Sequence, residues 1–232
     1  MNTKMKVLSL ALVGLCGYAG SALAGTTCPT SPSPPWTAVN ALGGTAQIVA
    51  GGYAGTACRL DSTLTGDATS FATVEDDSPS AEPRYRVHFI INADSIGTLG
   101  AVDAAYIFSA TSTAGPQIQL SIVGDGAGGK LVSFIVPNAN AAGGSDVGTY
   151  ALAAGENHIE FDLDNSGHFS FWLNNNDPNN ATFTDPNFSN GGATIETAFL
   201  GLAGPTTGFV AAAGGAVGFD QFDSRRTTFI GY

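Results

Sequence analysis

The segment from Glu156 to Asn174, ENHIEFDLDNSGHFSFWLN, constrains the fold of this chain more than any other. Apolar and polar residues alternate from His158 to Leu163 and again from His168 to Asn174, as they do in half-buried β-strands. The residues between these runs favour turns, and a three-residue loop ending on a left-handed Gly167 is a common hairpin connection. The segment therefore predicts an antiparallel hairpin.

The length of the loop decides which residues of the hairpin face one another. A two-residue loop would set apolar side chains opposite polar ones, so the three-residue loop is favoured. On the core face it pairs Leu163 with Phe169, Phe161 with Phe171, and Ile159 with Leu173. On the outer face it pairs Asp164 with His168, Asp162 with Ser170, Glu160 with Trp172, and His158 with Asn174.

Short alternating stretches continue along most of the chain and are broken by Gly, Asn, Pro and Asp. In 84–91 and 117–123 the apolar positions predict the core side chains Tyr85, Val87, Phe89 and Ile91, and Ile118, Leu120 and Ile122. Further strands are expected at 47–50, 58–61, 105–109, 131–136, 194–202 and 216–222, and loops at 75–77 and 138–148. This pattern predicts an all-β fold, an antiparallel two-sheet β-sandwich of jelly-roll type.

The first 24 residues have the features of a secretory signal peptide. Lys4 and Lys6 precede an apolar run that ends in the small-residue triplet 22–24, and the run is too short to remain as a membrane helix. The bulky residue before Cys16 disfavours the lipoprotein alternative. We expect a signal peptide at 1–24, an extended Pro/Ser-rich leader at 25–40 and one sandwich domain at 41–232. The style of the signal peptide indicates a bacterial protein that is exported to the periplasm or beyond.

Two cysteines, Cys28 and Cys58, remain after the signal peptide is removed. Export places them where thiols oxidise, so they are expected to form a disulfide that ties the leader to the body of the domain. No other metal ligands lie near them in the sequence.

The mature chain is strongly acidic. Two of the eight basic residues belong to the signal peptide, which leaves six basic groups against nineteen acidic groups, a formal net charge of −13. Such a surface repels phosphate groups, so nucleic acids and anionic membranes are excluded as partners. No later segment has the length and apolarity of a transmembrane helix.

Three segments resemble the concanavalin A-like jelly-roll superfamily, in particular bacterial secreted domains of laminin-G-like type. They are EPRYRVHFIINADSI at 82–96, the hairpin segment itself, and VGFDQFDSRRTTFIG at 217–231. The resemblance implies two curved sheets, with ligands, often glycans, on the concave face or at loop ends near calcium. Members of this superfamily include lectins, adhesion modules and glycosidases.

Trp172 is a large aromatic residue on the polar face of its strand. Beside it are Glu160, Asp162, His158 and Asn174, and an aromatic ring with polar neighbours is typical of a carbohydrate site. These five residues are the predicted ligand-binding site. The alternative is that Trp172 lies under a loop or the leader as ordinary packing.

A catalytic role is disfavoured, and no catalytic residue is assigned. Glu160, Asp162 and Asp164 share a face as in one glycosidase branch of the superfamily, but Asp164 stands where that pattern has Glu and lies at the turn. One structural calcium ion is a further alternative, with ligands unassigned. An EF-hand is excluded because Leu173 occupies the position that requires a bidentate Glu.

The sequence thus predicts a secreted, non-catalytic module that binds carbohydrate or another cell-surface component. The alternative is a structural or surface-associated protein-interaction domain. Glycoside hydrolysis is kept as a third, minor hypothesis.

Overall fold

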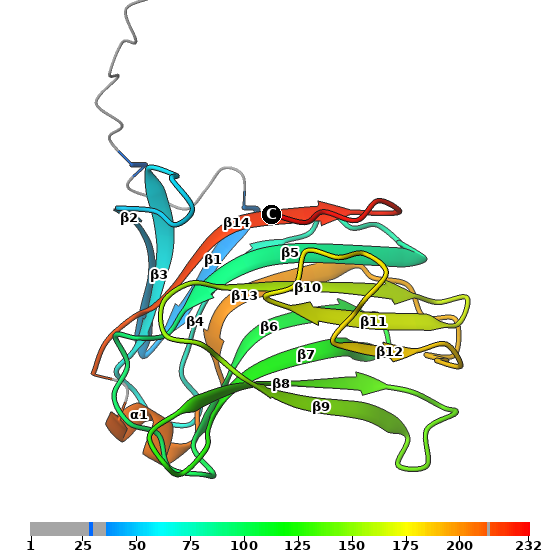
Figure 1. Ribbon diagram of the computed structural model, residues 1–232. Helices are drawn as coiled ribbons and strands as arrows, with labels where there is room; N and C mark the ends of the chain where they lie inside the picture. Colours follow the sequence, from blue (N-terminus) through cyan, green and yellow to red (C-terminus); the bar gives the residue numbers. More distant parts are fainter. Residues whose placement is uncertain (1–27, 30–35, 213) are drawn as a thin grey trace, which may run out of the picture.

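Two antiparallel sheets of seven strands each form the molecule (Figure 1). The computed structural model describes residues 28–29, 36–212 and 214–232, so the predicted signal peptide lies outside the described residues. Sheet A has the order β1 (Ala38–Leu42), β4 (Phe71–Asp76), β13 (Thr197–Ala203), β6 (Ala104–Ser112), β7 (Gly115–Gly124), β8 (Lys130–Pro137) and β9 (Ser145–Ala151). Sheet B has the order β12 (Phe183–Asp185), β11 (His168–Leu173), β10 (Asn157–Asp164), β5 (Arg84–Asn92), β14 (Val217–Arg225), β3 (Cys58–Leu64) and β2 (Gly44–Ala50). The predicted β-sandwich is confirmed.

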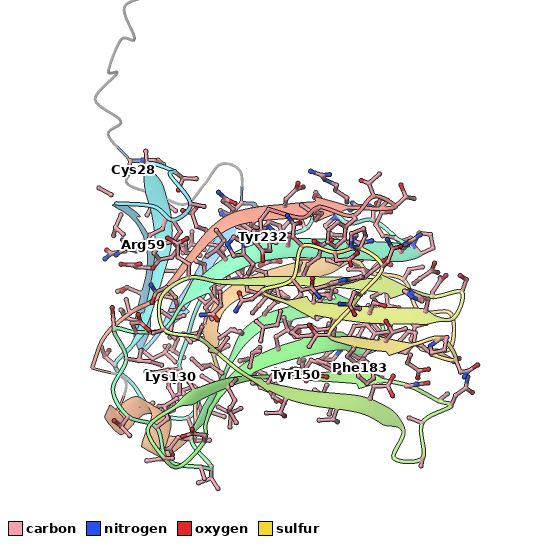
Figure 2. The ribbon with its side chains drawn as sticks, viewed as in Figure 1. Cys28, Arg59, Lys130, Tyr150, Phe183 and Tyr232 are labelled. Atoms are coloured by element: carbon pink, nitrogen blue, oxygen red, sulfur yellow. A yellow bond between two sulfur atoms is a disulfide. The ribbon has the colours of Figure 1, made fainter. Side chains whose placement is uncertain are left out.

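The core lies between the two sheets and is made of the residues that alternation predicted. All seven core positions predicted in β5 and β7 are fully buried. Phe108 of β6 packs against Phe89 of β5 and Phe161 of β10, with ring centres 5.8 Å and 5.3 Å apart. Burial of each such side chain stabilises the fold by roughly 1.5–3 kcal/mol. Tyr150 and Phe183, from the edge strands β9 and β12, add aromatic contacts where the two sheet edges meet (Figure 2).

The predicted hairpin is confirmed residue by residue. β10 and β11 pair in the register that the three-residue loop requires, from Ile159 opposite Leu173 to Asp164 opposite His168. Gly167 has a φ of 121°, which residues with a side chain rarely adopt. Asn174 lies just beyond β11, where its side chain accepts a hydrogen bond from the main-chain N–H of His158.

Some elements differ from the prediction. β9 begins at Ser145, inside the predicted loop 138–148, and β4 includes two of the residues in the predicted loop 75–77. β4 pairs with β1 and with the distant strand β13, which local composition does not reveal, whereas β9 pairs with β8, the strand before it in the chain. β1 begins at Ala38, within the range expected for the leader, and the short helix α1 (Thr207–Ala212) was not predicted.

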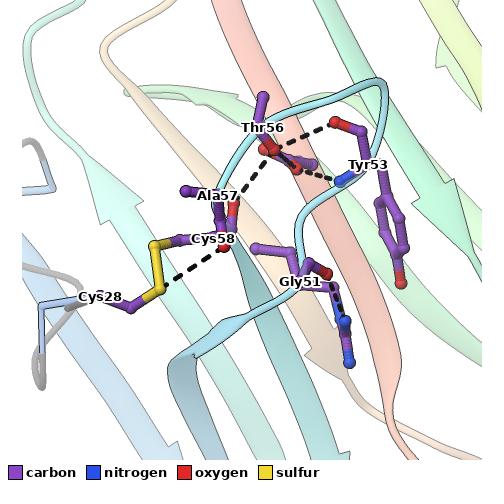
Figure 3. Close-up of a disulfide and its surroundings, with 8 residues drawn as sticks. Cys28, Gly51, Tyr53, Thr56, Ala57 and Cys58 are labelled. Carbon is purple, nitrogen blue, oxygen red and sulfur yellow. Dashed lines mark hydrogen bonds between the residues drawn. A yellow bond between two sulfur atoms is a disulfide. The ribbon is translucent and has the colours of Figure 1, made fainter. Parts of the chain in front are cut away.

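The disulfide between Cys28 and Cys58 is confirmed (Figure 3). It joins the described residues before β1 to the start of β3, beside the loop between β2 and β3. Within that loop the hydroxyl of Thr56 donates to the carbonyl oxygen of Tyr53, and the main-chain N–H of Tyr53 donates to Asp220 of β14. The disulfide and the loop together fasten this end of the sandwich.

Several strands are bent by irregular pairing. β14 shifts its register against β5 between Asp220 and Asp223, and β13 shifts against β6 between Leu200 and Ala203. Such bulges increase local twist and bend the strand. Both β13 and β14 curve strongly in Figure 1. The bends shape the outer faces of the two sheets, where ligands have access.

Candidate functional site

The structure brings the predicted site residues together on the outer face of sheet B. We call this surface, formed by β5, β10 and β11, the Trp172 face. Glu160 lies directly opposite Trp172 in the hairpin, as predicted, and Asp162 and His158 lie on the same side of β10. Asn174 is exposed at the end of β11. The five residues therefore lie on one face of sheet B, and their role in binding stays a prediction.

Their accessibility differs from what a carbohydrate site requires. Trp172 is only 4% exposed, and Glu160 and Asp162 are buried as well. The indole N–H of Trp172 donates to the carbonyl oxygen of Asp177, 3.0 Å away, and the ring of Phe229 packs against it edge-on at 5.5 Å. These contacts agree with the alternative in which Trp172 is covered and packed. The C-terminal segment, and not the leader, covers the ring.

Two arginines of β5 hold the carboxylates of this face. Arg84 makes two hydrogen bonds to Asp162, at 2.9 Å and 2.5 Å. Arg86 donates to Glu160 at 2.5 Å and to Asp162 at 3.1 Å. The pairing compensates the cost of burying these charges, and it occupies the oxygen atoms that a glycosidase would need for its substrate.

Two histidines lie stacked at the end of the same face. His88 and His158 have ring centres 5.5 Å apart, and Tyr232 stacks on His158 at 3.7 Å. Burial, and then the neighbouring His158 ring, lowers the pKa of His88, while burial lowers the pKa of His158. Both shifts favour the neutral form of the rings.

The outer face of sheet A carries an open groove of about 400 Å³, which the sequence reasoning did not identify. It is lined mainly by aromatic, amide and hydroxyl side chains, which include Asn40, Phe71, Tyr106, Ser109, Gln119 and Phe199. We call it the Tyr106 groove. No charged side chain lines it, although the chain as a whole is strongly acidic.

Strand pairing explains how these residues meet. Phe199 of β13 lies opposite Ser109 of β6, and Ser109 lies opposite Gln119 of β7. Tyr106 is 38% exposed and lies opposite Ala203, with its ring 3.3 Å from the position that a Cβ at Gly204 would occupy. Glycine at 204, with a φ of 53°, thus leaves room for the aromatic ring.

Two polar groups of the groove, on Tyr106 and Gln119, are free to bind. Among the described residues, neither the hydroxyl of Tyr106 nor the side-chain amide of Gln119 hydrogen-bonds to a protein group. Asn40 donates to Glu75, which lies just outside the groove, at 2.7 Å. A flat aromatic ring beside unpaired amide and hydroxyl groups can stack on a sugar ring and hydrogen-bond to its hydroxyls.

A larger hollow of about 620 Å³ lies between Trp36 and the bulge of β14. Its carboxylates already have partners within the protein. Asp220 accepts from the loop between β2 and β3, Asp223 pairs with Arg225 at 2.8 Å, and Asp76 accepts from the main chain of Ser78. The carboxylates of this hollow are therefore already engaged within the protein.

The alternation used to predict strands contained a signal for the Tyr106 groove. In the strand expected at 105–109, Ala105 and Ile107 face the core, so Tyr106 must face outward. An exposed tyrosine on a strand is a weak signal alone, because its neighbours Phe199 and Asn40 come from distant strands. A calcium site remains a prediction, and within 28–29, 36–212 and 214–232 no three acidic, His or Cys residues cluster as metal ligands.

No protein-family model matches the sequence, and no curated protein matches it either. Similar solved structures include the binding domain of botulinum neurotoxin serotype G, with a TM-score of 0.50 and 11% identity over 82% of this chain and 44% of that chain. The receptor binding domain of the botulinum neurotoxin C/D mosaic serotype also has a TM-score of 0.50, with 9% identity over 82% and 44%. An alginate lyase from Alteromonas sp. 272 has a TM-score of 0.45 and 10% identity over 72% and 83%.

These likenesses concern the fold. The chain spans less than half the length of the toxin domains that it matches, and the identities are too low to carry ligands or activities across. The neighbours support a sandwich of jelly-roll type, while the finer laminin-G-like assignment stays a prediction. No described helix has the length and apolarity needed to span a bilayer.

Proposed function

We propose that the protein is an exported, non-catalytic module that binds carbohydrate through the Tyr106 groove. The observation that carries the proposal is the exposed ring of Tyr106, flanked by the half-buried rings of Phe71 and Phe199, beside the unpaired amide of Gln119, without any charged side chain in the lining. The disulfide fits an oxidising compartment outside the cytoplasm. The sandwich fold shared with toxin receptor-binding domains is compatible with this role, although a fold alone does not name a ligand.

The uncharged lining favours a neutral glycan. An acidic polysaccharide would meet the field of a mature chain with thirteen excess negative charges, once the expected signal peptide is removed, and no cation in the groove to offset it. The Trp172 face fits a glycan less well, because its aromatic ring and carboxylates are already covered and paired.

Affinity electrophoresis through gels that contain neutral or acidic polysaccharides tests the proposal. The protein should be retarded by a neutral glycan, and Tyr106→Ala and Phe199→Ala should each abolish the retardation while the circular dichroism spectrum stays unchanged. Tyr232→Ala is a matched control on the opposite sheet. If Tyr232→Ala alters retardation and Tyr106→Ala does not, the ligand site is on the Trp172 face. Absence of retardation in every gel contradicts glycan binding.

A second candidate function is protein interaction at the surface of the cell. Ile135 of β8 and Val147 of β9 lie opposite each other beyond Gln119 and are 41% and 61% exposed. Exposed apolar pairs next to a groove are also found at protein interfaces. Concentration-dependent sedimentation that Val147→Asp abolishes, together with no response to glycans, would favour this function.

A further inference from the structure

We infer that the Trp172 face is a peptide-binding groove, occupied in this structure by the chain's own residues 229–232. Its ligand class is a short peptide of the pattern aromatic, any residue, glycine, aromatic, as in Phe229, Ile230, Gly231 and Tyr232. This inference concerns the opposite sheet from the Tyr106 groove, and it does not depend on the proposed glycan function.

The first argument is that the face recognises the main chain of this segment. The carboxylate of Glu160 accepts from the N–H of Ile230 at 2.9 Å and from the N–H of Gly231 at 3.0 Å. The side chain of Asn176 accepts from the N–H of Tyr232 at 3.1 Å and donates to the carbonyl oxygen of the same residue. Contacts of this kind to main-chain groups hold a peptide at a defined position whatever its side chains.

The second argument concerns the aromatic residues at the two ends of the segment. The guanidinium of Arg86 lies 4.7 Å from the ring centre of Phe229 and 4.7 Å from that of Trp172, so the cation lies against both rings, which also contact each other edge-on. At the other end, Tyr232 stacks on His158. The face therefore offers one aromatic subsite at Arg86 and a second at the histidine pair.

Position 231, between these subsites, has no room for a side chain, which explains the glycine there. Gly231 has a φ of 66°, and a Cβ added there would lie 2.4 Å from the side-chain oxygen of Asn176. Glycine thus lets the main chain turn and come close to Asn176. The requirement for glycine at this position makes the groove selective for sequence, in addition to its contacts with the main chain.

The third argument is that the side chains of the groove are also held by contacts within the folded body. Glu160 is held by Arg86, and Trp172 by the carbonyl oxygen of Asp177. Arg86 is itself buried, and its Nη2 atom has no hydrogen-bond partner among the described residues, although Nε and Nη1 are paired. A preorganised site costs little conformational entropy when a ligand binds.

The fourth argument is that the connection to the segment is weak. Thr227 and Thr228 are exposed and belong to no strand, and the segment forms no β-ladder with sheet B. Side chains of the folded body supply the hydrogen bonds that hold the segment. Another peptide with the same pattern would meet the same donors and acceptors, so it can replace the bound segment.

The test uses the full chain with a specific protease site inserted between the two exposed threonines. After cleavage of the folded protein, residues 228–232 are attached only by noncovalent contacts. A fluorescent synthetic peptide, Thr-Thr-Phe-Ile-Gly-Tyr, is then titrated against the cleaved and the uncleaved protein, and binding is followed by fluorescence anisotropy.

We expect saturable binding to the cleaved protein at peptide concentrations below about 1 mM, and at least about tenfold weaker binding to the uncleaved chain, whose own segment competes. Asn176→Ala in the cleaved protein should weaken binding about tenfold, since two hydrogen bonds are lost. Asn179→Ala replaces an exposed asparagine of the same loop whose side chain makes no hydrogen bond to the segment among the described residues, and it should not change binding.

A cleaved protein that retains its fold but shows no saturable binding up to about 1 mM overturns the inference. An Asn176→Ala variant that binds as tightly as its parent also overturns it. Asn176 is exposed, so its replacement should leave the fold intact even if changes at the buried Glu160 do not. The same peptide with Ala in place of Gly should bind at least about tenfold more weakly because of the close approach to Asn176.

Discussion

The guanidinium of Arg86 lies 4.7 Å from the ring centre of Trp172 and donates a 2.5 Å hydrogen bond to Glu160, which lies opposite Trp172 in the hairpin. This arrangement joins the three central strands of the Trp172 face. It also explains why a strand with carboxylates at alternate positions can be buried, since every charge on β10 beneath the C-terminal segment has an arginine partner.

Replacement of Arg86 should therefore be strongly destabilising. Arg86→Ala leaves Glu160 without its cation in a buried position, and we expect the free energy of unfolding in urea to fall by about 3 kcal/mol. Arg225→Ala provides the control, because Arg225 and its partner Asp223 are about 40% exposed and should contribute less than about 1 kcal/mol. Equal effects of the two substitutions would contradict this account.

Loss of the disulfide should also be measurable. Cys28 and Cys58 are 30 residues apart in the sequence, and the loop-entropy estimate for such a link is about 3 to 4 kcal/mol. We expect reductant to lower the urea midpoint of the parent protein and to have no effect on the double variant Cys28→Ser, Cys58→Ser. An unchanged midpoint on reduction would show that the link adds no stability.

The hairpin could be predicted to the residue because its signals are local. Alternation sets the two faces of β10 and β11, and Gly167 sets the turn, so the opposition of Glu160 and Trp172 followed from about fifteen residues of sequence. The cover over Trp172 could not be predicted in this way. Phe229 reaches Trp172 from a segment more than fifty residues later, and no local pattern reports that contact.

The Tyr106 groove was missed for a related reason. Alternation identifies Tyr106 as facing outward, but its importance depends on which strands lie beside β6. The order β4, β13, β6, β7 joins segments from distant parts of the sequence, and it places Phe199 and Gln119 on either side of Ser109. Such long-range pairing is fixed by the whole fold and not by neighbouring residues.

The contact between the edge strands β9 and β12 should depend on pH. The side chain of Asn138 donates to Asp146 of β9 and to Asp185 of β12, both at 2.8 Å. Burial, together with the neighbouring Asp185, raises the pKa of Asp146, with the Asn138 hydrogen bond opposing. A raised pKa in the folded state favours the protonated form, so this contact stabilises the fold at acid pH and loses strength as the pH rises through that pKa.

Asp146→Asn tests this dependence, because the amide oxygen can still accept from Asn138 while the charge is removed. We expect the variant to be more stable than the parent at pH 7 to 8, by up to about 1 kcal/mol because the group is partly exposed. The difference should disappear near pH 3 to 4, where the parent carboxyl group is protonated. A variant that is less stable than the parent at pH 7 would show that the ionised carboxylate of Asp146 stabilises the fold.

The stacked histidines predict a second pH dependence, of opposite sign, on the Trp172 face. The pKa values of His88 and His158 are lowered in the folded state, chiefly by burial, so folding favours the neutral rings. The unfolded chain binds protons near the ordinary histidine pKa of about 6.5. Stability is therefore fully present above about pH 6.5 and declines as the pH falls below it.

His158→Phe should remove part of this decline. Phenylalanine keeps a ring for Tyr232 to stack on but cannot be protonated, and it relieves His88 of a neighbour that would carry a like charge. We expect the variant to match the parent at pH 7.5 and to lose less stability between pH 6.5 and 5, as measured by urea unfolding across the pH range. Below pH 5 the carboxylates also titrate, so that region does not report on the histidines. Parallel curves for parent and variant between pH 6.5 and 5 would mean that protonation of His158 is not coupled to folding.

Binding of the synthetic peptide to the cleaved protein should weaken over the same pH interval, because two protonated histidines beneath Tyr232 repel each other.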